Sequence, residues 1–209
     1  MMILKKKVKN MLKNTHDFKP LEGKYVNLRE AEVEDAAFIL ALRTDPKKSR
    51  FIHQTDPDLQ KQIEYMKHYK TLEDEWYFII ENKQHEPLGT NSVYPYPPLT
   101  KEWISTENPE KGILGPGRWL IKDGANPMES IESDYLIKLF FFETLNLNDL
   151  PMMIHEDNKT VLNFHKKWGV KIIGYEEKIK HHLLMMQKSD FEKNRRFFET
   201  FIYGRNKEN

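Results

Sequence analysis

A nine-residue stretch, KDGANPMES at residues 122–130, combines residue types that begin helices with residue types that can bind anions. Asn126 is a favourable N-cap, and Pro127 at the first helical position lacks an N–H group that the helix would leave unpaired. Glu129 stands three residues after the cap, as in a capping box. These features predict a helix that begins at residue 127, and capping explains all of them without a ligand.

The same stretch could hold a phosphate group. The first turn of a helix carries unpaired N–H groups and a partial positive charge, so an anion can dock where a strand leads directly into it. Gly124 and Ala125 would let a ligand approach the backbone closely, and Lys122 would add positive charge. Glu129 argues against this role, because its carboxylate competes for the same amides. Capping and anion binding therefore remain two interpretations of one loop.

Apolar periodicity indicates the elements that position this loop. Strands are predicted at residues 25–28, 75–82, 88–97, 118–122, 150–155, 170–175 and 181–187. Helices are predicted at residues 31–44, about 57–72, 127–145 and 158–169, and one more begins at a Ser189 or Asp190 cap. Residues 97–117, rich in proline and glycine, read as a long irregular loop. This order predicts an α+β fold, a mixed α/β arrangement in which a central, mostly antiparallel sheet is flanked by helices.

The expected domain organisation is one domain with an appendage at each end. Residues 1–20 form a basic helical extension, residues 21–188 form the domain, and residues 189–209 form a C-terminal helix. The extension either packs one face on the domain or contacts a membrane surface.

Composition excludes several classes of protein. The chain of 209 residues has 33 lysines and arginines against 32 acidic residues, which argues against nucleic-acid binding. It has no cysteine, so disulfides and thiolate metal sites are excluded and a cytoplasmic location is expected. The eight histidines show no metal-ligand clustering beyond His181 and His182, which should point to opposite faces of a strand. No apolar run is long enough for stable membrane insertion.

Residues 158–174 resemble the Gcn5-related N-acetyltransferase (GNAT) superfamily. In that superfamily an Asn opens a short helix, which ends in a Lys-x-Gly-Phe-like step into a strand that carries a Gly. The matching residues are Asn158, Lys167, Trp168, Gly169, Val170 and Gly174. An early motif of the LRxAxxxDA type agrees, with Leu28, Arg29, Ala31, Asp35 and Ala36. The resemblance covers residues 21–187 and implies a GNAT-like fold that transfers an acetyl group from acetyl-CoA to a primary amine.

The resemblance also implies where acetyl-CoA binds. The superfamily holds the pyrophosphate on a Gln/Arg-x-x-Gly-x-Gly/Ala loop, and this chain departs from that pattern with one glycine, then alanine, asparagine and proline. A strand amide polarises the thioester carbonyl, from the strand before the loop. The cofactor-binding residues implied are Trp119, Leu120, Ile121, Lys122, Gly124, Ala125, Asn126, Pro127, Met128, Glu129, Ser130 and Asn158.

Candidate catalytic and acceptor residues come from the resemblance for His165 and His53, and from residue type and position for the others. In the superfamily, a Tyr on the later short helix often serves as general acid, and His165 occupies the matching position. A histidine there can act as the general acid, or it can be a buried, hydrogen-bonded side chain. His155 and Glu30 are candidate bases, although the amine could also arrive neutral. Substrate-binding candidates are His53, Tyr94, Tyr96 and Trp103, and core packing is the alternative role for the aromatic ones.

The sequence therefore predicts an acetyl-CoA-dependent N-acetyltransferase. Residues 124–130, taken with the later segment that carries Asn158 and His165, look like the branch that acetylates amino sugars in bacterial surface-polysaccharide synthesis. The predicted acceptor is thus a small-molecule amine, a nucleotide-linked amino sugar. Two alternatives stay open: an acetylase of protein N-termini or lysines of the ribosomal-protein type, and a non-catalytic acyl-CoA-binding module. A homodimer also stays open.

Overall fold

The computed structural model describes residues 19–104 and 112–204. The chain divides into two compact units. The first unit comprises the residues up to 94 together with 118–136, and the second comprises 95–117 together with 137 onward. Of the predicted N-terminal extension, residues 1–18 lie outside the described part of the chain. No helix in the described ranges is long and apolar enough to cross a membrane.

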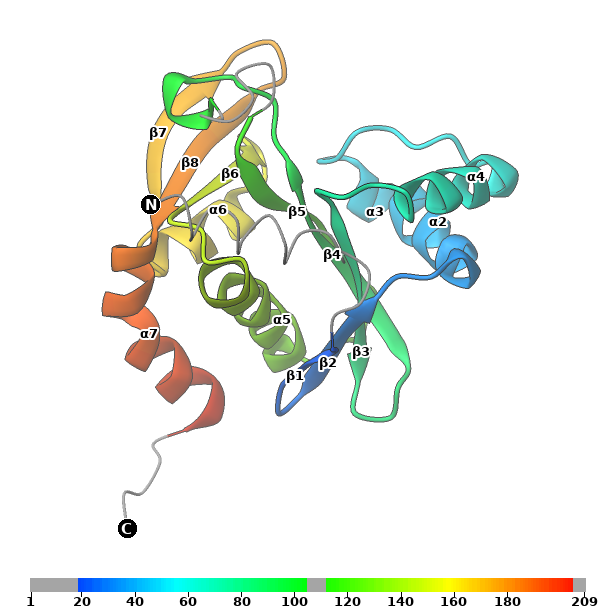
Figure 1. Cartoon of the computed structure of the whole chain (residues 1–209), viewed down its shortest axis with the longest axis horizontal. Helices are drawn as coiled ribbons and strands as arrows, with labels where there is room; N and C mark the ends of the chain where they lie inside the picture. The colour runs from blue at the N-terminus through cyan, green and yellow to red at the C-terminus, as the bar shows by residue number, and fades with distance from the viewer. Residues whose placement is uncertain (1–18, 105–111, 205–209) are drawn as a thin grey trace. The chain divides into compact units, whose positions relative to one another are not determined.

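The first unit is built on a sheet with the strand order β1-β2-β3-β4-β5 (Figure 1). Its strands are β1 (Leu21–Glu22), β2 (Val26–Glu30), β3 (Trp76–Asn82), β4 (Pro87–Pro95) and β5 (Leu114–Ile121). Its helical segments are η2 (Val33–Asp35), α2 (Ala36–Thr44), α3 (Pro46–Ser49), α4 (Leu59–Tyr69) and α5 (Pro127–Leu139). β5 and α5 each contribute residues to both units.

The early motif of the LRxAxxxDA type organises the core of the first unit. Leu28, Ala31 and Ala36 are buried, and the two alanines belong to a cluster in which α2 and α4 pack against β3. Arg29 donates two hydrogen bonds to the Asp35 carboxylate, at 2.7 and 2.8 Å. The motif therefore works by packing and by a bidentate ion pair, which fixes the turn from β2 into α2.

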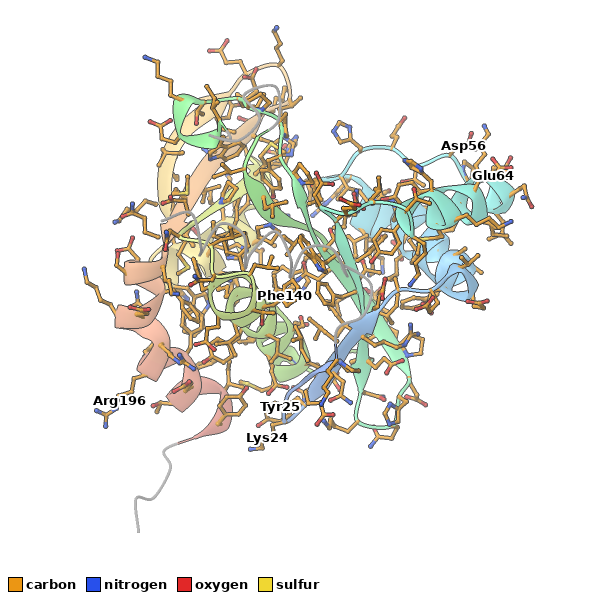
Figure 2. The ribbon with its side chains drawn as sticks, viewed as in Figure 1. Lys24, Tyr25, Asp56, Glu64, Phe140 and Arg196 are labelled. Atoms are coloured by element: carbon orange, nitrogen blue, oxygen red, sulfur yellow. The ribbon has the colours of Figure 1, made fainter. Side chains whose placement is uncertain are left out.

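Buried Glu132 on α5 ties that helix to the turn between β1 and β2. Its carboxylate accepts backbone hydrogen bonds from Lys24, Tyr25 and Val26 at 2.7, 2.6 and 2.9 Å (Lys24 and Tyr25 are labelled in Figure 2). A Cβ at Gly23 would lie 2.5 Å from the same carboxylate, so only glycine permits this approach. The first unit thus holds α5, and the loop before it, in a fixed place against the sheet.

The second unit contains a three-stranded sheet with the order β6-β8-β7. Its elements are η3 (Lys101–Trp103), the π-helical turn Phe140–Thr144, β6 (Asp149–His155), α6 (Lys159–Lys167), β7 (Lys171–Glu176), β8 (His181–Gln187) and α7 (Lys188–Tyr203). Gly169, with φ of +88°, ends α6 as the sequence predicts. Trp168 stacks on Phe198 of α7, with ring centroids 3.7 Å apart.

The α+β class is confirmed, and the structure corrects several details. The strands form two sheets rather than one central sheet, and every pairing whose register is described is antiparallel. β5 begins at Leu114, inside the stretch that the sequence predicts as loop. The N-cap of α7 is Gln187 rather than Ser189 or Asp190, because β8 leads into the helix without an intervening turn.

Candidate functional site

The loop between β5 and α5 has the predicted capping box. The Asn126 amide donates to Glu129 Oε2 at 2.7 Å, and the Met128 amide donates to Asn126 Oδ1 at 2.9 Å. The Glu129 amide donates to the Asn126 carbonyl at 2.9 Å. Glu129 therefore folds back onto the cap. Most amides of the first turn are used within the turn itself.

Two amides before the cap are left for an anion. Gly124 is exposed and Ala125 is half-buried, and neither amide has a hydrogen-bond partner among the described residues. Gly124 has φ of +86°, a conformation that glycine adopts at little cost. Asp123 pairs with Lys48 of α3 at 2.5 Å, and this hydrogen bond lowers the pKa of Asp123. These donors fit a pyrophosphate, with Lys122 and the helix dipole as further positive charge.

β5 is the strand before the loop, to which the family resemblance assigns the amide that polarises the thioester. It is an edge strand, and the Lys122 amide just after it donates to the Leu88 carbonyl on β4 at 2.8 Å. Because backbone groups alternate along a strand, those of Leu120 face β4, and those of Trp119 and Ile121 point away from it. Trp119 also donates from its indole to Ser133 Oγ at 3.1 Å. Among the predicted cofactor-binding residues of β5, Trp119 and Ile121 therefore lie on the side of the strand away from β4.

A cavity of about 280 Å³ lies in the first unit, between the helical segments and the sheet. Arg43 of α2, Gln62 and Tyr65 of α4, Tyr77 of β3 and Arg118 of β5 line it, together with Thr55 and Asp56 before α4. Asp56, labelled in Figure 2, pairs with Lys61. The lining is polar and aromatic, as in pockets that orient a small molecule through a few fixed groups.

Arg118 is the central charged residue of this cavity. It has φ of +53°, pairs with Glu75, and lies over the Tyr94 ring at 4.4 Å. Tyr65 donates to the same Glu75 carboxylate at 2.8 Å. Burial opposes the charge of Arg118, but Tyr65 and Glu75 keep its pKa above the ordinary arginine value. A positive φ outside glycine is an uncommon conformation, and its place in a cavity favours a binding role.

The remaining predicted residues of the first unit lie near this cavity or on the sheet. Tyr94 reaches it through Arg118, whereas His53 is exposed and is not part of its lining. Glu30 forms an ion pair with Lys70 at 2.8 Å and accepts from the Tyr69 hydroxyl at 3.3 Å. Both contacts favour a structural role for this carboxylate, and its role as a base stays a prediction.

The predicted residues of the second unit occupy β6, α6 and the segment before β5. Asn158 is the N-cap of α6, accepting from the Val161 amide at 3.4 Å. His165 is buried, with its ring edge-on to Phe164. His155 Nδ1 accepts from the Asp157 amide at 3.2 Å, which places a proton of the neutral ring on Nε2. The catalytic roles of His165 and His155 stay predictions.

Tyr96 and Trp103 pack together in the second unit. Both are buried, their rings meet edge-on at 5.3 Å, and the Tyr96 hydroxyl donates to the Pro116 carbonyl. This arrangement agrees with the core-packing alternative, and the role of these two residues in acceptor binding stays a prediction. A larger cavity of about 360 Å³ in this unit has none of the predicted residues in its lining, and its Lys171 is paired with Asp190.

Sequence reasoning missed Arg43, Gln62, Tyr77 and Arg118. Their partners are distant in the chain, so no local motif marks them: Arg118 and Glu75 are 43 positions apart. The glycine-proline-glycine run before Arg118 was a weak signal that its backbone is unusual. No group of three or more potential metal ligands occurs in the residues that the structure describes.

Comparison with known proteins places this geometry in a superfamily. No protein-family model matches the sequence, and no curated protein matches it. Among solved structures, the chain is similar to apo FdhC, described as a nucleotide-linked sugar GNAT. The TM-score is 0.73 at 26% identity, over 89% of this chain and 99% of that one.

Two more distant structures share the fold. One is a Gcn5-related N-acetyltransferase from Brucella melitensis, with a TM-score of 0.67 at 13% identity over 89% of this chain and 86% of that one. The other is the spermidine/spermine N-acetyltransferase SpeG from Vibrio cholerae, in mutant forms, with a TM-score of 0.63 at 12% identity over 83% and 99%. The chain thus has the GNAT fold, and the predictions of this superfamily and of an N-acetyltransferase are confirmed.

Proposed function

We propose that the protein transfers an acetyl group from acetyl-CoA to the primary amine of a nucleotide-linked amino sugar. The observation that carries this proposal is the likeness to FdhC, a nucleotide-linked sugar GNAT, over nearly the full length of both chains. The polar and aromatic cavity around Arg118 supports a small-molecule acceptor, because it offers fixed donors and ring faces rather than a flat surface.

Each predicted residue has a proposed role in cofactor binding or in catalysis. Gly124, Ala125 and Lys122 hold the pyrophosphate, and the edge of β5 at Trp119 and Ile121 holds the acyl arm. Bound acetyl-CoA would supply the thioester, and an amide of that edge would polarise its carbonyl in the manner of an oxyanion hole. From the sequence resemblance, His165 is the proposed general acid for the thiolate, and His155 or Glu30 is the proposed base for the amine.

The charges of the cavity disfavour a polyamine acceptor. The cavity has three positive charges in or beside its lining, from Arg43, Lys61 and Arg118. Two carboxylates, those of Asp56 and Glu75, carry negative charge there. A substrate with several positive charges would meet net repulsion there. The likeness to SpeG, at 12% identity, supports the shared fold and carries no argument for its substrate.

Thiol release tests the proposal cleanly, because the chain contains no cysteine and gives no background with a thiol dye. The purified protein and acetyl-CoA are mixed with UDP- and dTDP-linked amino sugars, with spermidine, and with a peptide that has a free N-terminus. We expect release with a nucleotide-linked amino sugar above the other amines. Preference for the peptide would favour the protein-acetylase alternative, and calorimetric binding of acetyl-CoA without any release would favour the acyl-CoA-binding module.

A further inference from the structure

The cavity of the first unit contains one positive charge that no described carboxylate offsets. Arg118 is paired with Glu75, and Lys61 is paired with Asp56. Arg43 donates from Nε to the Thr55 hydroxyl at 2.8 Å, and no carboxylate of the described chain lies in ion-pair contact with it. A half-buried guanidinium has five N–H donors, so most of its hydrogen-bonding capacity is left for a ligand.

Two buried polar groups of the same lining have unmet hydrogen bonds. The Gln62 amide nitrogen is buried without a partner, on a residue that is only 7% exposed. The Tyr77 hydroxyl lies beside Arg43 and Thr90 but makes no hydrogen bond of ordinary geometry in the described structure. Unpaired buried polar groups cost folding free energy, so two of them around one cavity need a reason.

Each of these groups can donate a hydrogen bond. Burial raises the pKa of Tyr77, so its hydroxyl stays protonated and can donate. Arg43 has no acceptor atom, and the Gln62 nitrogen is a donor as well. A ligand that satisfies this set must present acceptor oxygens, and one net negative charge would offset Arg43. The volume of about 280 Å³ holds on the order of nine waters at about 30 Å³ each, which is enough for one charged group and part of a ring.

We propose that Arg43, Gln62 and Tyr77 form an oxyanion subsite, and that the amine acceptor carries a phosphate or carboxylate group that binds there. This inference rests on the proposed function for its use in acetyl transfer. Within the proposed acceptor class, it assigns the anionic group of the acceptor to a named set of residues. The subsite accounts for the missing carboxylate opposite Arg43 and for both buried donors.

Calorimetry without acetyl-CoA tests the subsite directly, using inorganic pyrophosphate, UDP and glucuronate as probes. We expect Arg43→Gln to raise Kd by roughly 10- to 100-fold, the effect of losing one hydrogen-bonded charge. Arg50→Gln is the matched control, since it removes the same charge from an exposed residue that stacks on Phe51 outside the cavity. Arg43-dependent binding of pyrophosphate or UDP would identify a phosphate, and that of glucuronate would identify a carboxylate.

A second variant separates binding from folding. Gln62→Met removes the unpaired amide while keeping the length of the side chain, so we expect an unchanged or higher melting temperature together with a weaker anion complex. The subsite is overturned if no probe binds, or if Arg43→Gln and Arg50→Gln give equal Kd values. A lower melting temperature with unchanged Kd in Gln62→Met would also overturn it, because the amide would then be structural.

Failure of the subsite and failure of the proposed function give different results. If anions bind through Arg43 but no amine is acetylated, the acetyl-transfer proposal fails and the subsite stands. If Arg43→Gln acetylates neutral and anionic amines with the same KM values as the wild type, the subsite fails and acetyl transfer stands.

Discussion

Arg118→Met should destabilise the protein mainly through Glu75. The change removes the guanidinium and keeps a long side chain, so the backbone strain at φ of +53° is present in both proteins. Glu75 keeps only the Tyr65 hydroxyl of its two described partners. The side chains of Arg118 and Glu75 are 20% and 9% exposed, so the carboxylate is left in a largely dry site.

The magnitude follows from that burial. Removing one partner of a buried ion pair costs about 3–5 kcal/mol, and the partial exposure of Arg118 places the loss near the lower end, about 3 kcal/mol. For a chain of this length, that loss corresponds to a fall in Tm of about 6–12 °C. The double variant Arg118→Met with Glu75→Gln should recover about 2 kcal/mol of it, because no buried charge is left unpaired.

Urea unfolding of the four proteins of this cycle measures the coupling free energy. Circular dichroism and tryptophan fluorescence must give coincident transitions, because a chain with two compact units need not unfold in one step. A coupling free energy below about 0.5 kcal/mol would refute a stabilising interaction between Arg118 and Glu75, because residues that do not interact give values in that range. The KM for the acceptor should rise in Arg118→Met even under conditions where the variant is fully folded.

Four further predictions address other parts of the chain. Glu132→Ala should lower the free energy of unfolding by about 3–5 kcal/mol in urea, because three backbone amides lose a buried acceptor. Glu129→Ala should lower the free energy of unfolding by about 1 kcal/mol, because a capping interaction is lost. The affinity for acetyl-CoA, measured by calorimetry, should be unchanged or tighter. His165→Ala should reduce turnover with acetyl-CoA affinity nearly unchanged; unaltered turnover removes it from the mechanism. The Glu156 carboxylate raises the pKa of Tyr175 to about 12 by favouring the neutral phenol, so Glu156→Gln should return it toward about 10 in an NMR titration.

The sequence predicted the elements whose patterns are local. β8 occupies residues 181–187 as predicted, and α6 is preceded by its Asn158 cap and followed by Gly169. β5 was mislocated because its first residues, LGPG, carry the composition of a turn. Gly115 is needed there for close packing: a Cβ would lie 2.7 Å from Pro151 and 3.0 Å from Tyr96. Composition alone does not distinguish a glycine in a turn from a glycine that lets another side chain pack closely against the backbone.

The candidate site was predictable only where it is continuous in sequence. The α5 loop and its cap were found because Asn126, Pro127 and Glu129 are neighbours. The cavity brings together α2, α4, β3 and β5, and its pairs join residues such as Arg118 and Glu75 that are far apart in the chain. Sequence patterns report which face of an element is buried, and they do not report which polar groups meet after folding.

The two interpretations of the α5 loop prove compatible, and their combination has a consequence for cofactor binding. The capping box uses the amides of Asn126, Met128 and Glu129, so Glu129 is bound to its own cap and does not fill the position of a phosphate. The amides left for an anion are those of Gly124 and Ala125. Because these are fewer than a fully open first turn would offer, the proposed binding of acetyl-CoA would depend more on the edge of β5. A strand edge would hold the acyl arm through backbone groups alone, so it would tolerate the loss of a glycine-rich loop.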